Sequence, residues 1–220
     1  MSKAQSELPA AVKSAGRPKA SEVEARTQEL IETACRLILH HGYTKVSLET
    51  IAREARVAVR TIYVKFGGKA GLLSAVLASR RERLFAGCSM DADPRPLREI
   101  VDDFARDFYE MLVDPETMAM QRVVIAEAAS NPELAHAFYE GGPRLTRETL
   151  HRFFARSDIR SQLRDDVPMD MVPVHLIGCI CGDPIGRFLF PDAAPTREEA
   201  RRNLAARLEL FYAGVLKSVK

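Results

Sequence analysis

The sequence predicts an all-α fold made of a short N-terminal helical unit and a longer helical region. Apolar residues recur at helical spacing through most of the 220 residues. Gly and Pro clusters separate these periodic segments, and no stretch of four or more residues alternates convincingly as a strand does. With 46% apolar and 28% charged residues, the composition is that of an ordinary soluble protein.

The composition argues against a membrane, secreted or zinc-binding protein. The longest apolar runs fall far short of the ~20 residues that cross a bilayer, and the start of the chain lacks the apolar segment of a secretion signal. Cys35, Cys88, Cys179 and Cys181 show no zinc-type spacing. We therefore expect a cytoplasmic protein with no metal site, no cofactor and no membrane partner.

Charge is distributed unevenly along the chain. Residues 1–70 contain 12 Lys and Arg against 7 Asp and Glu, a net charge of +5, whereas residues 71–220 contain 20 against 23, a net charge of −3. A basic N-terminal third favours a local anionic partner, with nucleic acid ahead of a membrane surface. A merely solvated basic surface would give the same numbers, so charge alone does not decide.

A first helix is expected over residues 21–41, after a disordered basic tail at residues 1–20. Gly42 follows the helix and suits the left-handed position beyond its end. The expected apolar stripe of this helix consists of Leu30, Ala34, Leu37, Ile38 and His41.

Two short helices are expected next, at about 47–55 and 59–65, with Ser47 as the N-cap of the first. The three residues between them give the pair the proportions of a helix-turn-helix. The second helix of such a unit can enter the roughly 12 Å major groove of DNA while the first braces it. The apolar positions that would pack the pair are Ile51, Ala52, Ala55, Val57, Ile62 and Phe66.

Helical periodicity continues beyond this unit. Pro173 and Pro184 lie inside one expected helix and should kink or split it. The further helices are expected at residues 69–86, 97–113, 116–130, 133–156, 170–190 and 196–218.

A long set of residues keeps a fixed spacing through the first third of the chain. The set is Leu30, Ala34, Leu37, Ile38, Gly42, Tyr43, Ser47, Ile51, Ala52, Ala55, Val57, Thr61, Ile62, Tyr63, Phe66, Lys69 and Leu72. In order and spacing it resembles the TetR family of transcription regulators. That resemblance implies a three-helix helix-turn-helix DNA-binding domain at 21–68 (motif about 47–66), a connecting helix at 69–90, and a C-terminal helical ligand-binding and dimerisation domain at 91–220.

Two positions depart from the family pattern. Arg56 stands where the family usually has Gly, and Ala58 where it usually has Ser. A left-handed turn at a non-Gly residue costs roughly 1–2 kcal/mol, so Arg56 is expected to favour a different turn geometry. Loss of the Ser cap at Ala58 should cost about 1 kcal/mol of local helix stability.

The resemblance also implies which residues contact DNA. Lys69 has a second argument, because free backbone N–H groups at a helix start attract phosphate. Two alternatives stay open: Tyr63 as a packing residue and Thr61 as a plain surface residue. The residues expected on the DNA backbone are Thr44, Ser47, Tyr63 and Lys69, and those expected on the base-reading face are Val59, Arg60, Thr61 and Lys65.

The basic segment Gly16-Arg17-Pro18-Lys19 has two interpretations. Arg beside Pro on a flexible arm can enter a narrow minor groove. The plainer interpretation, a soluble tail with incidental charge, is favoured here.

The C-terminal helices are expected, by the same resemblance, to form a dimer interface and a ligand pocket. A Phe or Met stripe at helical spacing is also what an ordinary core needs. The expected dimer interface consists of Leu176, Ile180, Leu204, Leu208, Phe211 and Val215. The expected pocket residues are Phe104, Phe108, Met111, Met118, Phe138, Phe153, Met171 and His175.

His175 and Cys179 are four residues apart and can share a helix face, although a polar core or interface role suits His175 better than metal binding. Cys179 and Cys181 point to different faces, which favours inert buried thiols over a redox pair.

The expected function is a repressor that binds a palindromic double-stranded operator as a homodimer and is released by an unidentified small apolar ligand. A small helical enzyme is the alternative from another class, but the sequence contains no nucleophile elbow, phosphate loop or zinc-protease motif and no catalytic residue is assigned. A non-specific DNA-architectural protein is a third alternative, which saturable binding to one palindrome would exclude.

Overall fold

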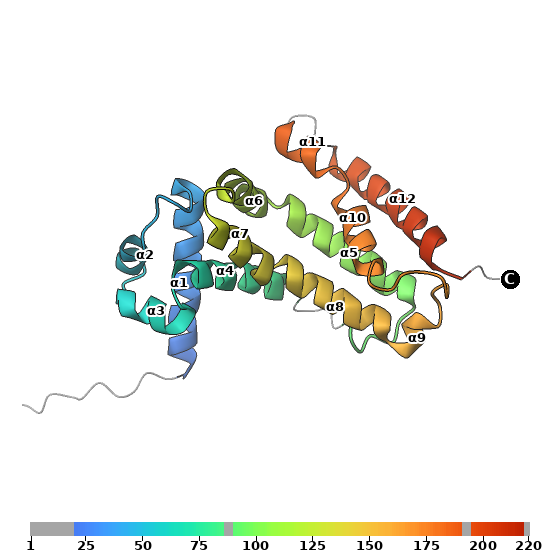
Figure 1. The fold of residues 1–220 in the computed structure, drawn as a ribbon, viewed down its shortest axis with the longest axis horizontal. Coiled ribbons are helices and arrows are strands. Elements are labelled where there is room, and N and C mark those ends of the chain that lie inside the picture. The colour runs from blue at the N-terminus through green and yellow to red at the C-terminus, as the bar shows by residue number, and fades with distance from the viewer. Residues whose placement is uncertain (1–19, 86–89, 191–194, 218–220) are drawn as a thin grey trace, which may run out of the picture.

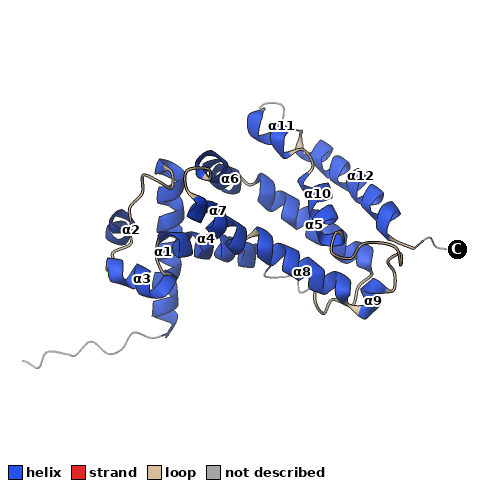
Figure 2. Ribbon diagram, viewed as in Figure 1, coloured by secondary structure: helices blue, strands red, loops and turns tan. Residues whose placement is uncertain are grey.

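The computed structural model describes residues 20–85, 90–190 and 195–217, and confirms an all-α fold. All the regular secondary structure in these ranges is helical (Figure 2). The β pairing within them is limited to an isolated bridge between Leu163 and Leu216. The molecule is elongated, with α1–α3 at one end and α10–α12 toward the other (Figure 1). The tail at residues 1–19 lies outside the described residues.

The N-terminal unit consists of α1 (Ala20–His41), α2 (Leu48–Glu54) and α3 (Val59–Phe66). The expected stripe on α1 is buried, with the exception of His41, which is exposed because it lies in the last turn, beyond the packed part of the helix. Ile51 on α2 and Ile62 on α3 are fully buried in the core that they share with α1. The apolar spacing in the sequence therefore predicted this core correctly.

The turn between α2 and α3 keeps a left-handed residue. Arg56 has φ +54°, so the expectation of a different turn is wrong: the chain tolerates the strain. The Arg56 N–H donates to the carbonyl of Arg53 at 3.2 Å, and Val57 N–H donates to Ala52 at 2.9 Å. These two backbone hydrogen bonds stabilise the left-handed turn although Arg56 stands where the family usually has Gly. Ala58 begins α3 without a side-chain cap, as the sequence indicated.

A long connecting helix, α4 (Lys69–Phe85), leads from the N-terminal unit into the rest of the chain. It packs closely against α7, where a Cβ on Gly141 would lie 2.8 Å from the carbonyl oxygen of Ser74. The remaining helices are α5 (Leu97–Val113), α6 (Pro115–Glu127), α7 (Pro132–Gly141), α8 (Pro143–Ala155), α9 (Ser157–Arg160), α10 (Val172–Cys181), α11 (Pro184–Leu189) and α12 (Arg197–Val215).

Two expected helices are each divided. The single helix expected over 133–156 is wrong, because Gly142 leaves helical geometry and Pro143 starts α8. The helix expected over 170–190 splits at Gly182, whose φ is +63°, and Pro184 opens α11. Pro173 lies in the first turn of α10, where its missing N–H costs nothing, so it causes no kink.

The buried apolar residues form two separate cores. The first joins α1–α4 to α6 and α7, and the second joins α5 to α8–α10 and α12. The first core therefore extends well past the N-terminal unit, and two helices of the C-terminal region belong to it.

Candidate DNA and effector sites

The exposed face of α3 is the candidate base-reading surface. Arg60 and Thr61 are exposed on it, and Tyr63 is 57% exposed. Ile62 and Phe66 pack on the opposite face against the first core. Val59 is half-buried against that core, so it contributes more to packing than the sequence suggested.

Val64 is the most exposed large apolar residue of the molecule's described part, at 77%, and sequence reasoning missed it. It lies four residues after Arg60, so helical spacing places both on one face. That spacing was the available signal. An exposed Val on a recognition helix can contact the methyl group of thymine.

Four of the expected DNA-binding side chains have partners within the protein, and Lys65 and Ser47 are the first two. The Lys65 ammonium donates to the hydroxyl of Thr27 on α1. The Ser47 hydroxyl caps α2 by accepting from the Thr50 N–H at 3.2 Å, which confirms the N-cap. Lys65 and Ser47 remain exposed to solvent. To bind a DNA phosphate, each must give up its present hydrogen-bond partner or bind both at once.

Lys69 is turned inward rather than toward solvent. Its ammonium donates to the carbonyl oxygen of Tyr43 and lies 4.1 Å from the centre of that ring. Burial lowers the pKa of Lys69, while the charges of Glu133 and Glu127 oppose the shift. A phosphate contact by Lys69 therefore requires its side chain to leave this position.

The last residue of α6, Glu127, holds the loop between α1 and α2. Its carboxylate accepts from the N–H of Tyr43 at 3.0 Å, from the N–H of Thr44 at 2.8 Å and from the Thr44 hydroxyl. Burial alone would raise the pKa of Glu127, but these hydrogen bonds and the charge of Lys69 lower it overall. Asn131 adds a bond from its amide to the Thr44 hydroxyl at 3.0 Å. Sequence reasoning assigned Thr44 to DNA alone and missed this link, for which the sequence has no local signal.

An apolar cavity of about 340 Å³ lies between the two cores. Helices α4, α6 and α7 of the first core and helices α5 and α10 of the second contribute to its wall. The volume falls within the range of small-molecule sites. Residues from the first core that line it include Leu77, Met120, Val124 and Phe138, and those from the second include Phe108, Met111, Leu112 and Ile177.

Three of the eight expected pocket residues, Phe108, Met111 and Phe138, line this cavity. The others do not. Phe104 and Phe153 are fully buried in the second core, because every face of these side chains is packed. The remaining three lie elsewhere, with Met118 in a second cleft and Met171 and His175 exposed.

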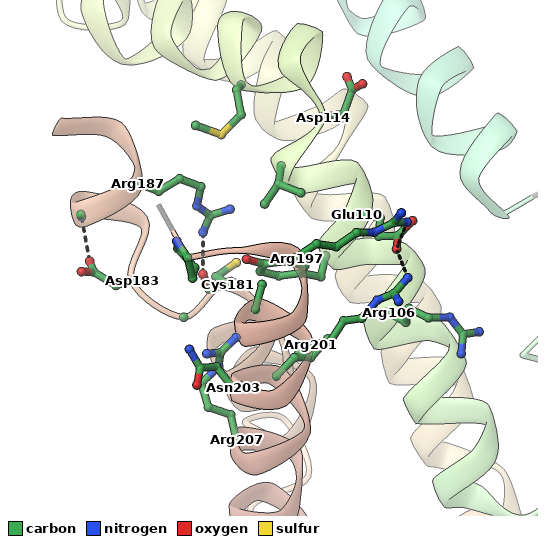
Figure 3. A pocket seen from close by; sticks show the side chains of 18 of the residues that line it. Arg106, Glu110, Asp114, Cys181, Asp183, Arg187, Arg197, Arg201, Asn203 and Arg207 are labelled. Atoms are coloured by element: carbon green, nitrogen blue, oxygen red, sulfur yellow. Dashed lines mark hydrogen bonds and ion pairs between the residues drawn. The ribbon is translucent and has the colours of Figure 1, made fainter. Parts of the chain in front are cut away.

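The second cleft, of about 830 Å³, lies between α5, α11 and α12. Figure 3 shows Arg197 and Arg201 reaching Glu110, to which they donate at 2.9 and 3.3 Å. These ion pairs hold α12 to α5. Many charged side chains line this cleft, so it suits a small apolar ligand less well than the apolar cavity does.

The cysteine and histidine side chains of α10 do not form a reactive site. The Cys179 sulfur lies 4.0 Å from Nε2 of His175, whose ring packs 5.6 Å from that of Phe211. Burial raises the pKa of both Cys179 and Cys181, which disfavours the reactive thiolate. No group of three or more potential metal ligands occurs within residues 20–85, 90–190 and 195–217.

The expected dimer interface needs correction. Leu176, Ile180, Leu204, Leu208, Phe211 and Val215 are all buried inside the chain, where α10 and α12 pack on each other and on α5. An apolar stripe on a helix shows that one face is buried. Here other helices of the same chain cover that face. The outer faces of these helices instead expose Val174 on α10 and Leu210 on α12, which is 73% exposed.

One apolar stretch, Val172–Leu189, has a mean hydropathy of 1.2 and is long and apolar enough to span a membrane by composition, and 22% of it is buried. It is divided into α10 and α11 at Gly182. The broken helix, and the exposed apolar side chains that it carries, fit a protein contact better than a membrane span.

Comparison with known proteins agrees with this architecture. The family model described as bacterial regulatory proteins, tetR family, matches residues 30–76, and that of the AefR-like transcriptional repressor C-terminal domain matches residues 99–214. An uncharacterized HTH-type transcriptional regulator of Mycobacterium bovis is 27% identical over 179 residues, which is 79% of this chain and 81% of the relative.

Two solved structures share the fold. The flavonoid-responsive regulator FrrA has a TM-score of 0.70 at 24% identity, covering 89% of this chain and 100% of its own. The SmeT–triclosan complex has a TM-score of 0.63 at 18% identity, covering 88% and 93%. The C-terminal match alone spans more than half of the sequence, and the N-terminal match covers the helix-turn-helix. The chain belongs to the TetR family of DNA-binding transcription regulators, which are not enzymes.

Proposed function

We propose that this protein is a cytoplasmic repressor that binds a palindromic operator as a homodimer and leaves it when a small apolar molecule fills the 340 Å³ cavity. The position of the cavity carries the proposal. It lies between a core that includes the helix-turn-helix and a core that does not. A molecule that binds there more tightly in one arrangement of the two cores than in another shifts the protein toward that arrangement.

On the DNA side, α3 supplies the specific contacts. Arg60 can donate to guanine or to phosphate, Thr61 can bond either base edges or phosphate, and Val64 can contact thymine. Lys65 and Lys69 add charge once they exchange their internal partners for phosphate. Tyr63, which is exposed, is placed to reach the DNA backbone.

Two helices connect the cavity to this surface. Leu77, Arg80 and Arg81 of α4 line the cavity, and the same helix begins at Lys69 beside the recognition helix. Met120 and Val124 of α6 also line it, and α6 ends at Glu127, which holds the Tyr43–Thr44 loop. A shift of either helix moves the recognition helix.

The dimer is proposed to form through the outer faces of α10, α11 and α12. Val174, Ile185, Leu189 and Leu210 are large apolar side chains left exposed there by the single chain. A recognition helix reads only a few base pairs, so two copies are needed for useful specificity. A dimer with a two-fold axis through this surface presents two identical recognition helices in opposite directions, and the matching operator is a palindrome.

Repression is favoured over activation because occupancy of a promoter is sufficient to block it, whereas activation needs a polymerase contact. The C-terminal family model is that of a transcriptional repressor. One structural neighbour is described as flavonoid-responsive and another was solved with triclosan. These neighbours support a small-molecule effector for this chain.

The first test is selection of binding sites from a randomised DNA duplex library. We expect an inverted repeat with half-site centres about 34–36 Å apart, or a multiple of that distance. A single unrepeated half-site, or no enriched sequence, contradicts the proposed dimeric repressor.

The second test is calorimetric titration of a screened apolar ligand with and without that operator. The ligand should bind the DNA complex about 5–150-fold more weakly, and the operator must weaken by the same factor. Met111→Trp should fill the cavity and abolish the ligand response while operator binding remains. Equal ligand affinities in the two titrations exclude that molecule as the inducer, and a ligand response that survives Met111→Trp places the effector site elsewhere.

A further inference from the structure

The apolar cavity has an unusual set of charged residues around it. Four arginines, Arg80, Arg81, Arg147 and Arg187, are among its lining residues, and the described lining contains no Asp or Glu. An apolar cavity for neutral molecules needs no such charge. Arg81 donates to the carbonyl oxygen of Leu145 at 3.3 Å and to the hydroxyl of Thr149 at 2.6 Å. The charges of the other three arginines are compensated to different degrees.

Arg80 is neutralised within the protein. It pairs with Glu116 and lies 3.7 Å from the carboxylate of Asp114. Arg187 is different, because its guanidinium donates to the carbonyl of Cys181 at 2.5 Å and no carboxylate lies within 4 Å of it in the described chain. Figure 3 shows this bond. Arg187 and Cys181 line both the cavity and the second cleft.

Arg147, on α8, lacks a partner for one buried atom. Its Nε is inaccessible to solvent and has no hydrogen-bond acceptor in the described structure. Its Nη1 donates to the Tyr139 hydroxyl at 3.4 Å, and its guanidinium carbon lies 5.6 Å from the centre of that ring. A buried donor on a charged group is costly to leave unsatisfied.

An anion in the cavity can instead bind the terminal guanidinium nitrogens of Arg147 and Arg187, which line it without a carboxylate partner in the described chain. A carboxylate or sulfonate oxygen can accept a charge-assisted hydrogen bond from a guanidinium, and such bonds are about twice as strong as neutral ones. A neutral apolar molecule would instead displace water from around these charges and offer them no counter-charge. A cation would be repelled by every uncompensated arginine of the lining.

We propose that the effector is an amphipathic acid, with an apolar body in the 340 Å³ cavity and one anionic group bound by Arg147 and assisted by Arg187. This inference rests on the proposed effector-controlled function and assigns the chemical class of the effector. The apolar walls fix the body of the molecule, and Arg147 selects its charge.

The test uses two probes with one ring system. 1-Anilinonaphthalene-8-sulfonate carries an anion, and N-phenyl-1-naphthylamine is the same skeleton without it. Both are titrated into the full-length protein at pH 7 and followed by fluorescence. Arg147→Met should weaken sulfonate binding by at least about 10-fold and change binding of the neutral probe by less than about 2-fold. Arg147→Lys, which keeps the charge, should retain most of the affinity for the sulfonate.

Two control variants locate the effect. Arg152→Met removes an exposed arginine of the same helix, paired to Asp91 at 3.4 Å, and should leave both probes unaffected. Met111→Trp fills the cavity and should abolish binding of both. Thermal unfolding of each variant separates a lost contact from a lost fold.

The outcomes distinguish this inference from the proposed function. If Arg147→Met weakens both probes equally, or neither, the arginine does not select an anion and the inference is wrong. If the sulfonate still binds Met111→Trp, it binds elsewhere and the assignment fails while the neutral probe can still establish the cavity. If neither probe binds the wild-type protein, the cavity is not a binding site and the effector part of the proposed function fails as well.

Discussion

The two hydrophobic cores of this protein differ in what they hold together. The first packs α1–α3 onto α4 and then continues onto α6 and α7, so it crosses from the DNA-binding unit into the C-terminal region. The second is confined to α5, α8–α10 and α12. The buried residues of α6 and α7 therefore belong to the same core as the helix-turn-helix rather than to the core of the helices that follow them in sequence.

The boundary between the two cores is the place where a bound molecule can affect both. The cavity separates the cores, and its wall is shared by Val124 and Phe138 of the first and Phe108 and Ile177 of the second. A packed core is not continuously deformable, so a molecule at this boundary changes how the cores meet rather than their interiors. Variants that change one core, its outer surface or the hydrogen-bonded link within it should therefore have separable effects.

The largest effect is expected at the outer surface of the second core. Leu210→Glu places a charge on the exposed face of α12 and should convert a dimer into a monomer, with at least about 100-fold weaker operator binding, because the two half-sites no longer act together. Sedimentation and operator titration measure both effects. A wild-type monomer at micromolar concentration contradicts the assigned surface.

The matched control lies two residues earlier on the same helix. Leu208 is 4% exposed within the second core, so Leu208→Ala should lower the free energy of unfolding by about 2–5 kcal/mol. It should leave the dimer intact. If instead Leu208→Ala dissociates the dimer and Leu210→Glu does not, the buried stripe is the interface after all.

A smaller effect is expected on the exposed face of α3, attached to the first core. Arg60→Ala and Val64→Ala should each cost about 1–3 kcal/mol at the preferred operator and relax the choice at particular base pairs. Lys69→Ala should weaken all sequences alike and reduce the salt slope by about 1. Binding-site selection with each variant provides the profiles, and profiles identical to wild type for Arg60 and Val64 contradict the assigned reading face.

The sequence predicted the first core's contacts better than those of the second. Ile51, Ile62 and the α1 stripe pack as their spacing indicated, because short helices joined by a three-residue turn leave few alternative packings. Spacing also marked the buried stripe at Leu204 and Leu208, but it indicates only that a face is buried. Whether the covering surface belongs to the same chain or to a partner depends on tertiary packing, which periodicity does not encode.

The site was predictable to a similarly limited degree. Arg60, Thr61 and Tyr63 are exposed as expected, and Val64 could have been added from helical spacing. The inward position of Lys69 and the bonds from Thr44 to Glu127 join residues more than twenty positions apart. No local pattern reports such contacts. The cavity-lining role of Phe108, as opposed to the core role of Phe104 four residues earlier, also depends on how α5 is rotated against its neighbours.

The smallest effect concerns the link within the first core. Glu127→Gln keeps the size of the side chain but removes the charge that accepts from the N–H groups of Tyr43 and Thr44, so unfolding free energy at pH 7 should fall by about 1 kcal/mol or less. Because folding lowers the pKa of Glu127, its contribution is fully present above the unfolded pKa of about 4.3 and is lost as pH falls through the lower folded value.

The stability difference between wild type and Glu127→Gln should therefore shrink below about pH 4, as measured by urea unfolding across pH. Glu54→Gln, on the exposed surface of α2, provides the control and should show no such trend. If Glu127→Gln gives a difference that is constant with pH, the carboxylate does not hold the loop by its charge. If it also leaves the coupling between ligand and operator unchanged, α4 alone connects the cavity to α3, and the first core transmits its motion through packing rather than through this hydrogen-bonded loop.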